Sequence, residues 1–271
     1  MLQELPSMPE RPERPRTFGL TLMLDKGLSV RQVEDILEVA GPYIDLVKLG
    51  WGTALLTPCL ERKLACYRAA GLPVYLGGTL FEAFYLRDEL DAYCRLVERL
   101  GLTHVEVSDG VLTIALEEKL RVIRRLAAHF VVLSEVGSKD AERILPPYRW
   151  VQQIQAELEA GSWKVICEAR ESGTVGLYRP SGEVRAGLVD EIVAMVPPEH
   201  LIFEAPRKAQ QVWFIRHLGQ CEPGQHRARR GAPAGNVAAG ASGRYAAGRL
   251  PTGFLGLLTD FFCETFAEAC A

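Results

Sequence analysis

The feature that most constrains the fold is a repeated pattern, in which a short apolar run of strand type is followed by a helical tract. Seven such runs lie at residues 17–24, 43–49, 73–76, 104–107, 130–133, 164–167 and 200–203. Helical tracts follow them at 30–40, 57–70, 81–100, 116–129, 148–160, 188–196 and 210–218. Each unit is about 25–37 residues long, and alternation at this period predicts parallel strands covered by helices. No run is followed by GxGxxG, so we expect an α/β fold of the TIM-type (β/α)8 barrel class rather than a dinucleotide-binding sheet.

An eighth unit is missing from this pattern. After Gln220 the sequence becomes rich in Ala, Gly and Arg and loses any period of 2 or 3.6 residues. One interpretation is a disordered extension that ends in a short amphipathic helix. We favour a shift of reading frame, because the codons allowed from Cys221 onward, read without their first base, permit a strand, a glycine turn and a helix that begin VNLGNI. We therefore expect an N-terminal arm at 1–16, a barrel domain at 17–220 and an aberrant tail at 221–271 in place of the eighth unit.

Composition and charge exclude several classes of function. The net charge of −3 argues against a general nucleic-acid binder. No apolar run approaches the roughly 20 residues that span a membrane, and the start of the chain lacks the apolar core of a secretory signal. Seven cysteines without a CxxC pair do not form a disulfide or zinc framework. We expect a cytoplasmic protein, a homo-oligomer, that acts on small molecules rather than on nucleic acid or membranes.

The run Lys164–Cys167 leads directly into a group of charged residues. Because alternate side chains of a strand share a face, we expect Ile166, Glu168 and Arg170 on the same side as Lys164. One interpretation is a structural ion pair that closes the strand. The other is a functional site at the carboxyl ends of the strands, and it gains weight because other runs also end in charged residues, namely Asp25, Lys26, Glu106, Glu135 and Glu204.

Several segments closely resemble phosphosulfolactate synthase. They are FGLTLMLDKG, YIDLVKLGWGTALL, YLGGTLFE, VEVSDG, LSEVGSKD, WKVICEARESGTVGLY and IFEAPRKAQQVWFI, and together they extend from about Arg16 to Gly219. The resemblance implies a TIM-type barrel and a Mg²⁺-dependent addition of sulfite to phosphoenolpyruvate. The implied product is (2R)-phospho-3-sulfolactate, a step towards coenzyme M or sulfolactate. The sequence departs from the family in its tail and at Ser138, where relatives often carry a second lysine.

The residue types suit that chemistry. Phosphoenolpyruvate carries a phosphate and a carboxylate, and sulfite is a third anion, so the site must concentrate positive charge. Negative charge then develops on the substrate carboxylate, where a divalent metal and lysines can stabilise it, and an acid must protonate the carbanionic carbon. Carboxylate oxygens are ligands that Mg²⁺ prefers. Unpaired carboxylates about 4 Å apart would repel by several kcal/mol per pair at an effective dielectric near 20, so cations must neutralise them.

The predicted site residues follow from these requirements and from the matching motifs. The predicted metal ligands are Glu106, Asp109, Glu135, Glu168 and Glu204, with Asp25 and Glu171 as further oxygen donors. The predicted catalytic residues are Lys48, Arg170 and Lys139. Of these, Lys139 matches the catalytic lysine of the family in its EVG-x-KD motif, and it is our candidate for the general acid. The predicted substrate-binding residues are Lys26, Gly77, Gly78, Lys208 and Gln210. The two glycines would allow close approach of the backbone to a phosphate.

Each group also has a purely structural interpretation that the sequence leaves open. Asp25 and Lys26 can form a turn, Gly77 and Gly78 can form a tight βα turn, and Lys48, Glu106 and Glu204 can form ion pairs between strands. Two other functions also stay open. One is a barrel enzyme that uses a different phosphoenolpyruvate or pyruvate enolate reaction, and the other is a non-catalytic, stress-associated homologue that serves as a binding scaffold.

Overall fold

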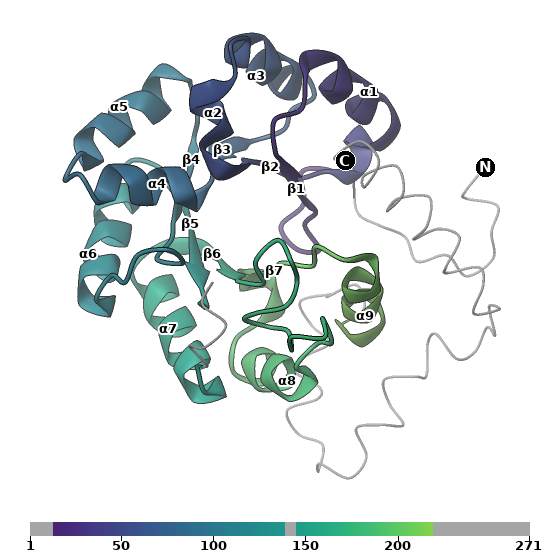
Figure 1. Cartoon of the computed structure of the whole chain (residues 1–271), viewed down its shortest axis with the longest axis vertical. Coiled ribbons are helices and arrows are strands. Elements are labelled where there is room, and N and C mark those ends of the chain that lie inside the picture. The colour runs from purple at the N-terminus through teal and green to yellow at the C-terminus, as the bar shows by residue number, and fades with distance from the viewer. Residues whose placement is uncertain (1–12, 139–144, 219–271) are drawn as a thin grey trace, which may run out of the picture.

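The computed structural model describes residues 13–138 and 145–218 of the chain. In this part of the chain, strands stand in a ring with helices on the outside (Figure 1). The strands are β1 (Leu22–Asp25), β2 (Leu46–Leu49), β3 (Val74–Leu76), β4 (His104–Val107), β5 (Val131–Val136), β6 (Ser162–Cys167) and β7 (Leu201–Phe203). All their ladders are parallel, as the alternation predicted. The expected α/β class with a barrel-like arrangement is therefore confirmed.

The helices cover the ring in chain order. They are α1 (Val30–Ala40), α2 (Thr53–Leu56), α3 (Leu60–Ala69), α4 (Gly78–Tyr85), α5 (Leu90–Arg99), α6 (Leu116–Ala127), α7 (Pro147–Glu159), α8 (Ala186–Met195) and α9 (Lys208–Leu218), with 3₁₀ turns at Gly41–Tyr43, Gly50–Gly52 and Pro198–His200. The single helical tract expected at 81–100 is wrong, because α4 and α5 are separate helices. Asp88 between them has a φ of 56°, and a residue in the left-handed region does not continue a right-handed helix.

The ring consists of two sheets, with the strand orders β1-β2-β3 and β4-β5-β6-β7. Strands β3 and β4 lie side by side without a ladder (Figure 1). Among the residues described, no ladder joins β7 to β1, so the barrel is not closed by main-chain pairing there. Lys139 and the predicted tail at 221–271 lie outside the described residues.

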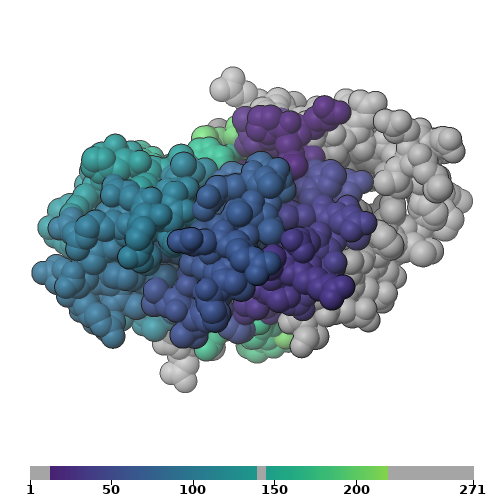
Figure 2. All heavy atoms as spheres, turned by 90° about the horizontal axis from the view of Figure 1, so that it is seen from above, coloured from purple at the N-terminus to yellow at the C-terminus, as the bar shows by residue number. Residues whose placement is uncertain are grey.

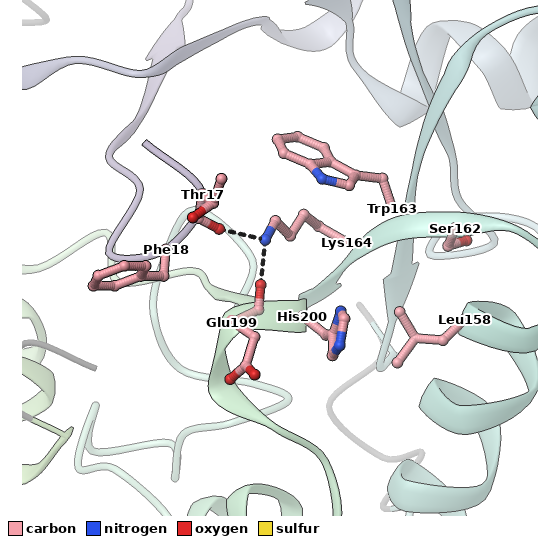
Figure 3. Close-up of a pocket in the computed structure, with 8 residues that line it drawn as sticks. All are labelled: Thr17, Phe18, Leu158, Ser162, Trp163, Lys164, Glu199 and His200. Carbon is pink, nitrogen blue, oxygen red and sulfur yellow. Dashed lines mark hydrogen bonds between the residues drawn. The ribbon is translucent and has the colours of Figure 1, made fainter. Parts of the chain in front are cut away.

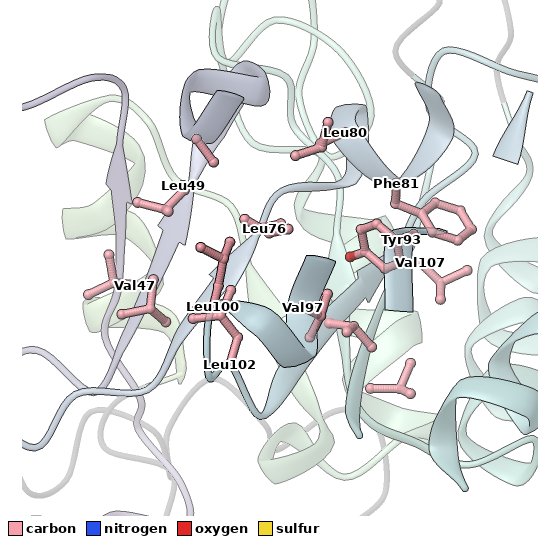
Figure 4. Close-up of a cluster of buried hydrophobic side chains, with 14 of the residues drawn as sticks. Val47, Leu49, Leu76, Leu80, Phe81, Tyr93, Val97, Leu100, Leu102 and Val107 are labelled. Carbon is pink, nitrogen blue, oxygen red and sulfur yellow. The ribbon is translucent and has the colours of Figure 1, made fainter. Parts of the chain in front are cut away.

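Strand alternation separates two apolar regions. Leu46, Leu133 and Ile166 point into the ring, where they form an interior cluster with Tyr75 and Ile202. The residues between them along the strands pack outward against the helices. Figure 4 shows part of that outer cluster, in which strand residues of β2, β3 and β4 meet Leu80, Phe81, Tyr93 and Val97 of α4 and α5. Each fully buried side chain of this size stabilises the fold by about 1.5–3 kcal/mol.

The atoms on the side of the molecule formed largely by the first half of the chain pack into a continuous surface (Figure 2). In Figure 2 the purple and blue segments join the teal segments without a break. No helix of the described part of the chain is both long enough and apolar enough to span a lipid bilayer.

Candidate active site

Lys48 is the centre of a charged group at the carboxyl end of the strands. It follows the inward-facing Leu46 by two residues on β2, so it also points into the ring. Its Nζ lies 3.0 Å from Glu106 Oε1, 3.4 Å from Glu135 Oε2 and 3.6 Å from Glu204 Oε1. These carboxylates come from β4, β5 and the end of β7. The structure thus brings four of the predicted site residues together.

The carboxylates of this group determine the pKa of Lys48. Burial alone would lower the pKa of Lys48, but the carboxylates of Glu106, Glu135 and Glu204 outweigh it and raise that pKa well above its ordinary value. Glu106 and Glu135 are almost completely buried, whereas 22% of the Glu204 side chain is exposed. Lys48 is therefore a firmly protonated ammonium inside an acidic group that opens to solvent on its β7 side.

Tyr75 lies beside Lys48 on the neighbouring strand β3. It pairs in register with Lys48, points into the ring and is fully buried. Burial, together with the nearby charge of Glu106, raises the pKa of Tyr75 well above its ordinary value, so the phenol stays neutral. Among the described residues its hydroxyl has no hydrogen-bond partner. The sequence analysis did not select Tyr75, although the alternation along β3 places it on the inner face.

Gly78 brings the first turn of α4 against Glu106. The Gly78 N–H donates to Glu106 Oε1 at 2.6 Å, and the Gly77 N–H donates to the carbonyl of Leu49 at 3.0 Å. A Cβ on Gly78 would lie 2.3 Å from Ser108 Cβ and 2.5 Å from Glu106 Oε1. The glycine is therefore required for close approach, here to a carboxylate of the protein. A phosphate contact of Gly77 and Gly78 stays a prediction.

Glu82 on α4 fixes the loop that follows β4. Its Oε2 accepts the N–H groups of Val111 and Leu112 at 2.9 and 2.6 Å, and its Oε1 lies 2.8 Å from Ser108 Oγ. Ser108 Oγ also lies 3.1 Å from Glu135 Oε1. Glu82 and Ser108 thus connect the loop to the group around Lys48. The sequence analysis missed both, and only the position of Ser108, two residues after Glu106, signals an inward direction.

Two predicted ligands hold backbone at the end of β6 and β7. Glu168 is buried and its Oε1 accepts the N–H of Arg170, while Glu204 Oε2 accepts the N–H of Ala169 at 3.2 Å. Arg170 itself is exposed and has a φ of 55°. The expectation that Arg170 continues the face of Glu168 is therefore wrong, because β6 ends at Cys167 and strand alternation stops there.

Asp25 and Asp109 form ion pairs with lysines other than Lys48. Asp25 accepts hydrogen bonds from Lys63 and Tyr67 of α3 and from the N–H groups of Gly27 and Leu28. Asp109 forms an ion pair of 2.7 Å with Lys119 of α6. Lys119 also lay outside the sequence prediction, since a lysine in an amphipathic helix gives no signal that it is buried.

The other predicted residues lie in the surrounding loops and at the start of α9. Lys26 forms an ion pair of 2.6 Å with Glu171 and lies over the ring of Trp51. The buried amide of Gln210 donates to the carbonyls of Gly173 and Gly182, so it holds the loop after β6. Lys208 is half-buried at the start of α9. Lys139 lies outside the described residues, and its role as an acid stays a prediction.

The acidic group around Lys48 offers oxygen ligands, and the predicted Mg²⁺ site stays a prediction. Carboxylate oxygens are what Mg²⁺ prefers. Three ionised carboxylates around one ammonium leave a charge of −2, which a divalent cation would balance. In the described part of the chain these oxygens converge on the Lys48 ammonium, and no group of three or more acidic, His or Cys side chains is arranged so that it could hold a metal ion.

A cavity of about 480 Å3 lies at the opposite, amino end of the strands. In Figure 3 Lys164 reaches across it and donates to the carbonyl oxygens of Thr17 and Glu199, while Trp163 and His200 form other parts of the wall. The predicted charged site is at the other end of the barrel, so this cavity is separate from it.

Comparison with known proteins identifies the family. A model of the family described as (2R)-phospho-3-sulfolactate synthase (ComA) matches residues 9–221. The chain is 39% identical over 217 residues to the phosphosulfolactate synthase of Methanothermobacter thermautotrophicus, covering 78% of this chain and 84% of that protein. It is 40% identical over 215 residues to that of Bacillus subtilis, with 78% and 85% covered. It is 42% identical over 207 residues to that of Methanocaldococcus jannaschii, with 74% and 82% covered.

Similarities to solved structures are weak. A phosphonopyruvate hydrolase in complex with oxalate and Mg²⁺ has a TM-score of 0.41 at 14% identity, covering 84% of this chain and 92% of that chain. A 3-hexulose-6-phosphate synthase has a TM-score of 0.40 at 16% identity, covering 64% and 74%. The match over residues 9–221 and the three relatives show that this chain belongs to the (2R)-phospho-3-sulfolactate synthase (ComA) family.

Proposed function

We propose that this protein is a carbon–sulfur lyase that adds sulfite to phosphoenolpyruvate in a Mg²⁺-dependent reaction and forms (2R)-phospho-3-sulfolactate. Membership of the family supports this activity. The structural observation that carries it is the convergence of Lys48 with Glu106, Glu135 and Glu204 at the carboxyl end of parallel strands. Active sites of barrels of this type lie at that end.

The reaction requires charge control rather than a covalent intermediate with the protein. The lone pair on the sulfur of sulfite bonds to the methylene carbon of phosphoenolpyruvate. The pair of the carbon–carbon double bond moves towards the substrate carboxylate, where the negative charge is spread over two oxygens. One proton must then reach the carbon that carries the phosphate. The site must therefore hold three anionic groups together and supply one acid.

The residues around Lys48 suit these tasks. The Lys48 ammonium stabilises negative charge on the substrate carboxylate and is itself kept protonated by the acidic side chains beside it. Lys139 is the proposed acid, and Arg170 and Lys26 add positive charge in the loops above. Lys208, Gly77 and Gly78 are proposed contacts of the substrate. Gln210 is proposed to act through the loop after β6, since its amide donates to that loop.

A bound Mg²⁺ would act as a Lewis acid towards the substrate carboxylate and would balance the acidic charge. Glu106, Glu135, Glu168 and Glu204 are the proposed holders, with Asp109 at the edge of the group. Binding of Mg²⁺ to the protein is measured by calorimetry without substrate. We expect Glu106→Gln to weaken it, and unchanged binding would remove Glu106 from this role.

The decisive assay follows sulfite-dependent consumption of phosphoenolpyruvate, with the product identified by mass spectrometry. It is run on this chain and on a chain with the reading frame restored from residue 221. We expect sulfite-dependent turnover with higher activity in the restored chain. Absence of turnover in both contradicts the proposal, and turnover without sulfite favours another phosphoenolpyruvate enolate reaction. An intact frame in the resequenced gene around codons 219–221 contradicts the frameshift.

Lys139→Ala tests the proposed acid. We expect product formation to fall by at least about a hundredfold, the usual size of general acid catalysis, while the thermal unfolding midpoint stays unchanged. Arg179→Ala serves as the control for lost positive charge in a loop, because Arg179 is exposed and pairs with the exposed Glu183, and its turnover is expected to stay near wild type. Near-normal turnover of Lys139→Ala would exclude the residue as the acid.

A further inference from the structure

Lys119 of α6 is a buried lysine that lies behind the strand ends. Only 2% of it is exposed. Its Nζ contacts three oxygens, which are Asp109 Oδ1 at 2.7 Å, Glu157 Oε1 of α7 at 2.7 Å and the main-chain carbonyl of Glu135 at 2.6 Å. An ammonium has three N–H groups to donate. This environment therefore uses all of them, and it connects α6 to α7, to β5 and to the loop after β4.

The contact with the Glu135 carbonyl replaces a missing strand partner. The β4–β5 ladder ends one residue earlier, at Ser134. On the opposite side, the carbonyl of Val136 accepts the N–H of Glu168. Successive carbonyls of a strand point to opposite sides, so that of Glu135 faces the β4 side, beyond the point where β4 ends. Lys119 binds the last carbonyl of β5 on this side.

The charge on Lys119 is held in place by its neighbours. Burial alone would lower its pKa, but Glu157 and Asp109 outweigh burial and raise it above its ordinary value. Burial raises the pKa of the Glu157 carboxyl, and the charge of Lys119 opposes that shift. The pair is therefore mutually dependent, and removal of Lys119 alone leaves Glu157 buried without its cation.

We propose that Lys119 is a positioning residue that fixes the end of β5 and thereby aims the Glu135 carboxylate at Lys48. The side chain of Glu135 leaves the same residue whose carbonyl Lys119 holds, and it reaches Ser108 at 3.1 Å and Lys48 at 3.4 Å. The inference rests on the proposed function, since it gives Lys119 an effect on turnover. A small displacement of a group in the site is enough to slow a reaction strongly.

The test separates positioning from simple structural support by use of a double variant. Lys119→Met alone is expected to lower the thermal unfolding midpoint, because Glu157 then lacks its cation. Lys119→Met combined with Glu157→Met removes both charges and is expected to recover most of that midpoint, since well-packed apolar pairs often replace buried ion pairs without loss. We expect the double variant to keep kcat at least about tenfold below wild type, with KM for phosphoenolpyruvate nearly unchanged.

Lys63→Met is the matched control. Lys63 of α3 is 1% exposed and pairs with the buried Asp25, so its loss also leaves a buried carboxylate without its cation. It holds a side chain rather than the carbonyl of a residue beside Lys48. We expect Lys63→Met to lower the unfolding midpoint as Lys119→Met does, while kcat below the unfolding transition stays near wild type.

A second measurement does not depend on activity. Hydrogen exchange in peptides that cover residues 131–138 is expected to increase in the double variant and to stay unchanged in Lys63→Met. A double variant with wild-type kcat and wild-type exchange overturns the proposal. If the wild-type chain shows no sulfite-dependent turnover, the proposed function fails, and the exchange data alone then decide whether Lys119 holds the end of β5.

Discussion

Two buried lysines in the same barrel interior have opposite surroundings. Lys48 lies at the carboxyl end of the strands and is 9% exposed, and Lys164 lies at the amino end and is 5% exposed. Three carboxylates converge on Lys48. Lys164 instead donates to two main-chain carbonyls, those of Thr17 and Glu199 (Figure 3), and no acidic side chain of the described residues forms an ion pair with it.

Their pKa values move in opposite directions for this reason. Burial tends to lower the pKa of both ammonium groups. At Lys164 burial prevails, and the more distant Glu199 only partly opposes it, so the pKa is lowered. At Lys48 the three carboxylates prevail and the pKa is raised. The same residue type thus has two different surroundings, as a cation among three carboxylates at one end and as a tie between the segments before β1 and β7 at the other.

The largest effect is expected for Lys48→Met. The variant leaves Glu106 and Glu135 buried without their cation, and loss of one partner of a buried ionic group costs about 3–5 kcal/mol. Urea unfolding measures the loss of stability, and the sulfite-dependent assay is expected to show no turnover. A change in unfolding free energy below about 1 kcal/mol would contradict the ionic role that the structure gives to Lys48.

Lys164→Met is expected to lower the free energy of unfolding by less, about 1–2 kcal/mol. It removes two hydrogen bonds to carbonyls but also removes the cost of burying an ammonium. Turnover below the unfolding transition is expected to stay near wild type, because the residue lies at the end opposite the charged site. Loss of activity in a folded Lys164→Met protein would contradict the view that only the carboxyl end of the strands takes part in turnover.

The dependence of stability on pH sharpens the comparison. The folded-state pKa of Lys164 is below its unfolded value, so its burial penalty is complete at pH values below the folded pKa. The penalty is relieved as pH rises towards the ordinary value of 10.5. We expect wild type to gain stability relative to Lys164→Met as the pH rises from neutral towards 10.5. A difference that is constant over this range would contradict the lowered pKa. Lys48 behaves oppositely, because its contribution is complete below 10.5 and is lost only above it.

The smallest effect is expected for Lys26→Met. Lys26 pairs with Glu171, but 27% and 41% of the two side chains are exposed, and exposed pairs contribute little. Urea unfolding should show a change of about 0.5 kcal/mol or less, which salt screens further. If Lys26→Met lowered the free energy of unfolding as much as Lys164→Met, burial would not explain why these lysines contribute differently to stability.

Local patterns in the sequence were enough for the layout of the barrel and part of the site. Periods of 2 and 3.6 residues depend on neighbouring residues, so they predicted parallel strands and outer helices. They also placed Glu106 and Glu135 at the carboxyl ends of their strands. The motifs identified the family. The break between α4 and α5 was missed because a left-handed Asp88 leaves no period to detect.

Only the tertiary structure decided which charges meet. Lys48 and Glu135 are 87 residues apart in sequence, and only folding brings their atoms to 3.4 Å. Folding also places Asp109 in an ion pair with Lys119. Arg170 does not lie on the strand face, because β6 ends at Cys167. Ionic partners are chosen by distance and burial in the folded chain, and neither is encoded by spacing along one strand. The sequence therefore determined the elements and the chemical types at their ends, and the packing of α6 and α7 against β5 decided how those ends are held.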